Sequence, residues 1–258
     1  MTSCGCSACC DRIVSPLSAD WLCPDWPAPA RVRSCVTTRQ PGVSLPPYDA
    51  FNLALHVGDD PRRVAHNRAL LCQRLGCQPG WLEQVHGTQV VAVDPQQVLV
   101  ADANWTDQPG LAACVMTADC LPALFCDRTG RCVAAAHAGW RGLLDGVLEA
   151  TLQALPAAPE DVLVWLGPAI GPASFEVGDE VREAFVARQA QAAQAFQRAA
   201  QPGKWLADLY LLARQRLAGY GVTAIYGGGF DTFRDPRFYS YRRGTPTGRF
   251  ASLVWLQD

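Results

Sequence analysis

Three short apolar runs follow one another in the middle of the chain, and they constrain its fold more than any other feature. The runs are LAACVMTADC, LPALFCD and RCVAAAH, which end at Cys120, Asp127 and His137. Short apolar runs bounded by turn residues are typical of buried β-strands, whereas helices need about 10–12 residues or more. Thr129-Gly130 marks a turn between the second and the third run. The sequence thus predicts a buried sheet in which one strand ends on a thiol and another on an imidazole.

Longer segments on either side of these runs carry apolar side chains at helical spacing. Asp60 fits an N-cap, Pro61 fits the first helical position, and Gly76 fits the end of that helix. Further helices are predicted over residues 140–156, 178–199 and 204–221. Further strands are predicted within residues 31–38, 81–87, 88–94, 161–172, 221–229 and 249–256, with a hairpin or a bend at Gly87. Because strands and helices intermix, and several strands are adjacent in sequence, we expect an α/β (α+β) fold of mixed sheets covered by helices.

The composition limits the partners that the chain can have. It has 258 residues, of which 49% are apolar and 18% are charged, with a formal net charge of −2. A balance so close to neutral gives no reason to expect a nucleic acid or an anionic membrane as a partner. No run approaches the ~18 apolar residues of a membrane span, and no secretory signal precedes the predicted strands. We therefore expect a cytoplasmic protein. A monomer or homodimer with small molecules as partners is a separate expectation, which these features neither require nor exclude.

Twelve cysteines raise the question of their chemistry. Four of them lie in the opening MTSCGCSACC, where a flexible extension over residues 1–20 is favoured over a thiolate-rich metal tail. The remaining residues, 21–258, are few enough to form one compact domain. Without export, the cysteines there other than Cys120 are expected to be reduced thiols packed as small hydrophobes; they are Cys23, Cys35, Cys72, Cys77, Cys114, Cys126 and Cys132.

Polar clusters at the ends of the predicted strands contain the candidate chemistry. EQVHG, TADC and HAGWRG place His86, Cys120 and His137 at such positions. Two imidazoles and a thiolate suit Zn²⁺, which is catalytic when three protein ligands leave a fourth position open. Glu83 and Asp119 flank these residues and are candidates for catalytic proton carriers or for partners of the ligands.

The same residues allow two other readings. Cys120 and His137 could form a metal-free nucleophile–base pair, with Asp119 or another acceptor orienting the imidazole. Two histidines and a cysteine are also the equatorial ligands of a blue-copper site, and Met116 lies nearby in sequence. A multicopper cluster, however, needs many more histidines than the four in this chain.

Several arginines lie in or near the same loops and suit a phosphate or a carboxylate, which a guanidinium binds through its planar fork. Arg39 in a Pro/Gly-containing loop and Arg141 beside HAG are the two that we favour as substrate or phosphate ligands. Asn52 and His56, in the cluster NLALHVGD, are the polar candidates for the same role.

Several motifs of the chain resemble those of a known family in their residues and in their order along the sequence. They are WLEQVHG, VMTADCLPALFC, AAHAGWRG, WLGPAIGP, FEVG and SYRR…TGR…SLVWL. From about Trp21 to the C-terminus the chain resembles the YfiH-type laccase-domain family, also called the multicopper polyphenol oxidoreductase laccase family. The resemblance implies a single four-layer α/β/β/α domain, similar to the catalytic domain of cytotoxic necrotizing factor. It also implies that His86, Cys120 and His137 are zinc ligands.

The resemblance further implies a purine nucleoside phosphorylase. Family members cleave adenosine, inosine, guanosine and methylthioadenosine with phosphate, and they also deaminate adenosine. We therefore expect catalytic roles for Cys120, His137, Glu83 and Asp119, with zinc as the cofactor and copper as the other candidate. A Cys/His hydrolase or a factor that edits peptidoglycan precursors is the alternative, and polyphenol oxidation is not favoured.

The chain departs from the family pattern near its C-terminus. Phe230-Asp231-Thr232 stands where the family is expected to have Arg-Cys-Thr, and Gly244 follows Arg243 where an acidic residue is usual. The three predicted zinc ligands are unaffected. A substrate contact that the family makes in this loop does not transfer directly to this chain.

Overall fold

A computed structural model describes residues 20–258 of the chain. The cysteine-rich extension and its alternative as a metal tail lie outside the described residues, apart from Asp20. The seven free thiols of the described part are Cys35, Cys72, Cys77, Cys114, Cys120, Cys126 and Cys132. Cys23 differs from the expectation of reduced thiols, because it is disulfide-bonded.

The three apolar runs form three consecutive strands of the chain. The first strand belongs to a four-stranded sheet, and the other two are neighbours in a six-stranded sheet. The six-stranded sheet has the order β14 (Ala224–Gly227), β10 (Val162–Leu166), β8 (Leu121–Asp127), β9 (Val133–Ala138), β6 (Ala103–Thr106) and β4 (Val90–Ala92). The four-stranded sheet has the order β1 (Val32–Val36), β15 (Phe250–Leu256), β7 (Leu111–Thr117) and β2 (Gln78–Gly80). Each sheet contains parallel and antiparallel pairs, which confirms the prediction of mixed sheets.

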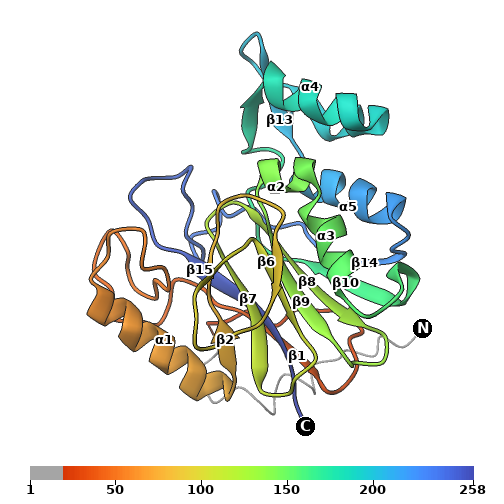
Figure 1. Cartoon of the computed structure of the whole chain (residues 1–258). Coiled ribbons are helices and arrows are strands. Elements are labelled where there is room, and N and C mark those ends of the chain that lie inside the picture. Colours follow the sequence, from red (N-terminus) through yellow and green to blue (C-terminus); the bar gives the residue numbers. More distant parts are fainter. Residues whose placement is uncertain (1–19) are drawn as a thin grey trace, which may run out of the picture.

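The two sheets pack face to face around a shared apolar core. That core includes Val115 and Val254 from the four-stranded sheet, with Leu124 and Val133 from the six-stranded sheet. On the outer face of the four-stranded sheet, Leu71 of helix α1 (Pro61–Leu75) packs in a second cluster. On the outer face of the six-stranded sheet lie α2 (Trp140–Asp145), α3 (Val147–Ala154) and α5 (Leu209–Gly219). Helix, sheet, sheet and helices therefore form four layers (Figure 1).

The ends of α1 follow the local chemistry of its sequence. The Asp60 side chain accepts a hydrogen bond from the backbone N–H of Arg62, and Pro61 occupies the first position, where no N–H is needed. Gly76 ends the helix with φ 65°, a left-handed conformation that costs glycine little. The prediction for this helix is confirmed at both ends.

The other helix predictions needed correction. The single helix expected over residues 140–156 is two helices, because Gly146 has φ 106° and interrupts it. The helix expected over 178–199 ends early as α4 (Asp179–Arg188), followed by the 3₁₀ helix η4 (Ala190–Ala195) and strand β12 (Phe196–Arg198). The helix expected from Lys204 begins only after strand β13 (Lys204–Ala207).

The part of the chain around α4 and β13 forms a small unit beside the body of the protein (Figure 1). Its three-stranded sheet has the order β11 (Glu176–Gly178), β13 and β12. The short 3₁₀ helix η3 (Pro159–Asp161) precedes β10, and a two-stranded sheet joins β3 (Leu82–Glu83) to β5 (Leu99–Val100). Strand β3 runs parallel to β5, and β4 runs parallel to β6. The chain therefore bends at Gly87 without forming the alternative hairpin.

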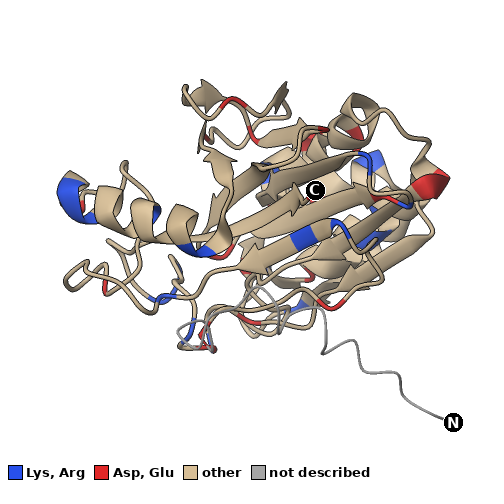
Figure 2. Cartoon of the chain, turned by 90° about the horizontal axis from the view of Figure 1, so that it is seen from below, with Lys and Arg blue, Asp and Glu red and all other residues tan. Residues whose placement is uncertain are grey.

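The charged side chains agree with the near-neutral composition. Lys and Arg positions are interspersed with Asp and Glu positions along the ribbon (Figure 2). Within residues 20–258, no helix is long and apolar enough to cross a membrane. The cytoplasmic location stays a prediction.

Candidate metal centre

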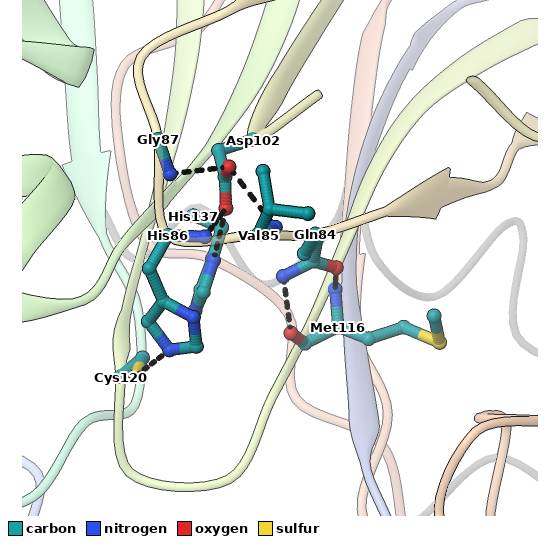
Figure 3. A network of polar contacts seen from close by, with 8 residues as sticks. All are labelled: Gln84, Val85, His86, Gly87, Asp102, Met116, Cys120 and His137. Carbon is teal, nitrogen blue, oxygen red and sulfur yellow. Dashed lines mark hydrogen bonds and ion pairs between the residues drawn. The ribbon is translucent and has the colours of Figure 1, made fainter. Parts of the chain in front are cut away.

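His86, Cys120 and His137 meet in space. One potential ligand atom of each lies within 4.8 Å of those of the other two, and no other such group of three or more occurs in the described part of the chain. The Sγ of Cys120 lies 3.8 Å from the Nε2 of His86 (Figure 3). The two imidazole centroids are 4.7 Å apart, and the ring planes meet at 70°. These three residues could therefore bind one metal ion.

The position of the cluster follows from the way the chain passes between the sheets. Cys120 lies in the turn between β7 of the four-stranded sheet and β8 of the six-stranded sheet. His137 lies in β9, opposite Pro122 of β8. His86 follows β3 in the bend that ends at Gly87. The cluster therefore forms where the two sheets and the β3 bend come together.

The absence of a side chain at Gly139 provides the space that the His86 ring and the Cys120 thiol occupy. A Cβ atom at this position would lie 2.6 Å from Cδ2 of His86 and 3.2 Å from Sγ of Cys120. A Cβ atom at Gly142 would lie 2.9 Å from the backbone oxygen of Gly87. The glycines of HAGWRG thus permit the close approach of the β9–α2 turn to the His86 bend.

The donor set and the spacing fit zinc. In a tetrahedral zinc site, a nitrogen ligand and a sulfur ligand lie about 3.5 Å apart. The 3.8 Å between His86 Nε2 and Cys120 Sγ is close to that value. Borderline-soft Zn²⁺ accepts imidazole and thiolate together, and three protein ligands leave one coordination position open.

Asp102, which contacts this cluster, was not among the residues predicted from the sequence. The Asp102 side chain is fully buried just before β6, and its Oδ1 lies 2.8 Å from Nδ1 of His137. The same carboxylate accepts hydrogen bonds from the backbone N–H groups of Val85, His86 and Gly87 (Figure 3). The sequence offered one signal for Asp102, which is its position inside the apolar stretch VLVADANW. A carboxylate in such a stretch is expected to be buried, and a buried carboxylate requires hydrogen-bond partners.

Cys120 and His137 shift each other's protonation. Burial acts to raise the pKa of the Cys120 thiol, but the positive charge and hydrogen bond of His137 outweigh it and lower that pKa to about 6. Burial acts to lower the pKa of His137, while the thiolate and Asp102 raise it to about 9. In the metal-free protein, each of these two groups thus favours the charged form of the other.

Two residues of the site have unusual backbones. His86 has φ 61° and Asp119 has φ 91°, and within residues 20–258 no other non-glycine residue has a positive φ. Such conformations cost free energy and persist only where the surroundings impose them.

Asp119 holds the C-terminal loop in place. Its carboxylate accepts from the Thr232 hydroxyl at 2.6 Å and from the backbone N–H of Arg242 at 2.7 Å. Asp231 accepts from the Gly171 N–H and the Ser174 hydroxyl. Asp231, which departs from the family pattern, and Thr232, which agrees with it, thus both take part in the hydrogen bonding that fixes this loop beside the cluster.

The four residues expected to bind substrate or phosphate lie in different surroundings. Arg39 pairs with Asp49 at 2.8 Å, and the exposed Arg141 stacks over Trp140 at 4.3 Å. Asn52 is fully buried, and its amide is bonded to neighbouring loop groups. None of the interactions recorded for these three residues joins them to the three-residue cluster.

His56 is exposed and lies in a positively charged environment. Partial desolvation of the ring lowers the pKa of His56, the charges of Arg249 and Arg68 lower it further, and Glu83 acts in the opposite direction. Burial also lowers the pKa of Arg249, against the negative charges of Cys120 and Asp119. Arg249 directly precedes Phe250, which pairs with Thr117 across the two strands. Arg249 of the TGR motif, which was not among the residues predicted from the sequence, is thus close enough to His56, Cys120 and Asp119 for their charges to interact.

Comparison with known proteins identifies the family. The family model described as multi-copper polyphenol oxidoreductase laccase matches residues 33–257. The chain belongs to this family. The resemblance seen in the motifs is confirmed, and so is the mixed α/β fold class that it implied.

Relatives in this laccase-domain family match nearly the whole chain. A protein of Pseudomonas aeruginosa named purine nucleoside phosphorylase is 65% identical over 239 residues, covering 92% of this chain and 99% of that one. The purine nucleoside phosphorylase YfiH of Escherichia coli is 54% identical, covering 91% and 98%. A crystal structure of a Neisseria meningitidis protein aligns with a TM-score of 0.90 at 48% identity, covering 93% of this chain and 100% of that one.

The word multicopper in the name of this laccase-domain family does not describe the cluster. Multicopper chemistry requires several copper ions with many histidines, and the chain has four histidines in total. Only His86 and His137 join the three-residue group in the described part of the chain. The ligands suffice for one ion.

Proposed function

We propose that this protein is a zinc-dependent purine nucleoside phosphorylase. The observation that carries the proposal is the convergence of two imidazoles and one thiolate within 4.8 Å. The names of the relatives support the reaction class, since proteins at 65% and 54% identity are called purine nucleoside phosphorylases. His86, Cys120 and His137 are the proposed zinc ligands.

Phosphorolysis makes two demands on the residues around the ion. An oxygen of phosphate bonds to C1′ of the ribose as the bond from C1′ to the purine nitrogen breaks. The electron pair of that bond leaves with the purine, which must take up a proton or a stabilising positive charge. Zinc, when bound, supplies positive charge at this site. Adenosine and phosphate thus give adenine and ribose-1-phosphate.

Arg249 and His56 are the residues that we propose for phosphate. Arg249 lies close enough to Cys120 and Asp119 for their charges to act on it, and its own charge acts on His56. A guanidinium binds phosphate through two parallel N–H groups. The pairing of Arg39 with Asp49 makes it a weaker candidate. Arg141 is also weaker, because its recorded interaction is with Trp140 and does not join it to the three-residue cluster.

The proton for the departing purine requires an accessible acid. Both carboxylate oxygens of Asp119 already accept hydrogen bonds from Thr232 and Arg242. The exposed Glu83, at the end of β3, lies near His56. We therefore assign proton delivery to Glu83 and a positioning role to Asp119.

Adenosine deamination by the same site is part of the proposal. Water would add its oxygen to C6 of the purine, and the amino group would leave as ammonia after taking up a proton, which gives inosine. The groups needed are again a proton carrier and positive charge beside the purine. The substrates of both reactions are small molecules.

The test is a product assay with adenosine, with and without phosphate. The zinc-loaded protein is expected to release adenine and ribose-1-phosphate only when phosphate is present. His137→Ala is expected to lose this activity, and His66→Ala, which changes an exposed histidine on α1, is expected to keep it. Normal turnover by His137→Ala, or no phosphate-dependent product from the wild-type protein, would refute the proposal.

A cysteine hydrolase is the second candidate, and one observation favours it. Cys120, His137 and Asp102 form a chain of nucleophile, base and orienting acid, with His137 Nδ1 2.8 Å from Asp102. Such an enzyme would cleave an amide or a peptide, including one in a peptidoglycan precursor. It would remain fully active after exhaustive chelation and lose activity in Cys120→Ser, whereas the phosphorylase would lose activity in both tests.

A further inference from the structure

We infer that Asp102 is a positioning residue of the metal centre, which orients the ring of His137 and the backbone of His86 so that Nε2 of each faces the ion. The inference rests on the proposed zinc site. It assigns a role to a residue that the family motifs quoted above do not contain. Asp102 contacts no substrate in this role and acts through the two histidines.

The hydrogen bonds around the Asp102 carboxylate fix the bend that contains His86. Three consecutive backbone N–H groups donate to this carboxylate, from Val85 at 3.2 Å, His86 at 2.9 Å and Gly87 at 2.6 Å. Three donors converging on one charge define the path of the bend. His86 adopts φ 61° within this bend, so the contacts offset the cost of its left-handed backbone. Asp102 therefore fixes the direction from which the His86 ring enters the cluster.

The Asp102 carboxylate also determines the tautomer of His137. Its Nδ1 lies 2.8 Å from Oδ1 of Asp102, and its backbone N–H donates to the Asp102 carbonyl at 2.7 Å. Because an ionised carboxylate only accepts hydrogen bonds, Nδ1 must carry the hydrogen. When the ring is neutral, Nε2 then has a free lone pair on the side of Cys120. This is the tautomer that a metal ion requires at Nε2.

An asparagine at position 102 could not make all the contacts that the Asp102 carboxylate makes with His137 and with the backbone of the bend. The Asp102 side chain is fully buried, so each of its polar contacts must be satisfied within the protein. An asparagine has one acceptor oxygen and an NH₂ group that donates. If the NH₂ group faced His137, Nδ1 would have to accept and the hydrogen would move to Nε2. If it faced the bend, it would oppose backbone N–H groups.

The experiment compares the zinc affinity of Asp102→Asn with that of the wild-type protein, by competition with a chromophoric chelator. Loss of such a supporting group lowers metal affinity by about 10–100-fold, and we expect a loss in this range. The matched control is Asp127→Asn. Asp127 is also buried and accepts the backbone N–H groups of Arg131 and Cys132, but in the β8–β9 turn. This control is expected to stay within twofold of wild type.

A measurement on the wild-type protein covers the case in which Asp102→Asn fails to fold. Long-range ¹H–¹⁵N correlation spectra report the tautomer of each histidine, and the chain has only four. The zinc-loaded protein is expected to show His137 with hydrogen on Nδ1 and zinc on Nε2. Hydrogen on Nε2 and zinc on Nδ1 would overturn the inference.

The outcomes separate this inference from the proposed function. A wild-type protein that binds zinc, beside an Asp102→Asn variant of equal affinity, overturns the positioning role alone. A wild-type protein that binds no zinc overturns the metal centre, and the inference fails with it. An equal loss of zinc affinity in Asp127→Asn also overturns the inference, because it would trace the loss to general destabilisation.

Discussion

Gly139 determines how closely the turn after β9 can approach the ligands. Its backbone is extended, with φ −61° and ψ 160°, a conformation that alanine adopts without strain. The requirement for glycine is therefore steric. A Cβ atom would lie 2.6 Å from Cδ2 of His86, which is closer than two carbon atoms can pack.

Gly139→Ala is predicted to displace the His86 ring and weaken metal binding. A displaced ligand should lower the zinc affinity by about tenfold or more, the scale seen when support for a ligand is lost. Chelator competition on the purified variant measures it. Gly219→Ala is the control, because a Cβ atom there meets nothing within 4 Å, and it should leave the affinity unchanged. Wild-type affinity in Gly139→Ala would mean that the turn can move aside.

At the residue scale, sequence reasoning found the groups that stand at the ends of apolar runs. Cys120 and His137 end two such runs, and His86 follows a third strand, so each was a predictable candidate at the end of a strand. Their meeting was not predictable in the same way, because the three strands belong to three different sheets. Asp102 was missed because its role depends on which backbone N–H groups fold back onto it. Arg249 was missed because Phe250 pairs with Thr117 across a long separation in sequence.

At the scale of elements, the turn between β8 and β9 depends on one carboxylate. Asp127 accepts from the backbone N–H groups of Arg131 at 2.5 Å and Cys132 at 3.0 Å, and from the Thr129 hydroxyl. Burial acts to raise the pKa of Asp127, but these hydrogen bonds outweigh it and lower that pKa to about 2. The charged form is thus favoured in the folded protein more than in the unfolded chain.

Asp127→Asn is predicted to destabilise the protein in a pH-dependent way. A depressed carboxylate pKa stabilises the fold above the unfolded pKa of about 3.9, and this is lost as the pH falls towards 2. The variant should lower the free energy of unfolding by about 2 kcal/mol at pH 7. Urea denaturation at pH 7 and at about pH 3 measures the difference, which should shrink in acid.

The control for this turn is Asp94→Asn, at a carboxylate that accepts the backbone N–H of Gln96 in an exposed loop. Its effect should stay within about 0.5 kcal/mol. An Asp127→Asn effect of the same size at both pH values would contradict the role of the charge.

Elements with strong local signals were predictable, and those set by distant packing were not. Asp60, Pro61 and Gly76 define both ends of α1 in the sequence itself. The Ala- and Gln-rich segment after Arg188 also favours a helix, yet the chain leaves the helix at Gln189. A continued helix would place Phe185 and Phe196 about 16 Å apart along its axis. In the structure their ring centroids are 6.0 Å apart, so burial of both rings outweighs helix propensity.

For the whole molecule, the position of Cys120 couples the metal site to the fold. The chain leaves the four-stranded sheet after Thr117 and enters the six-stranded sheet at Leu121. Cys120 lies in this crossing, His137 lies in the six-stranded sheet, and His86 lies in the bend beyond β3. An ion bound to all three joins parts of the chain that separate when the protein unfolds.

Zinc is therefore predicted to stabilise the entire protein. An ion that binds only the folded state, at about a thousandfold excess over its Kd, adds about 4 kcal/mol. For a chain of this size each kcal/mol corresponds to about 2–4 °C in Tm. Zinc should therefore raise the Tm by about 10 °C, as measured by scanning calorimetry of chelated and reloaded protein.

His137→Ala tests whether this stabilisation comes from the three-residue cluster. With one of its ligands removed, the site should bind zinc weakly, and the Tm of the variant should hardly respond to the metal. His66→Ala retains all three ligands and should respond as the wild type does. A rise of similar size in His137→Ala would place the stabilising ion elsewhere in the chain. In that case the link between the two sheets would not depend on the metal.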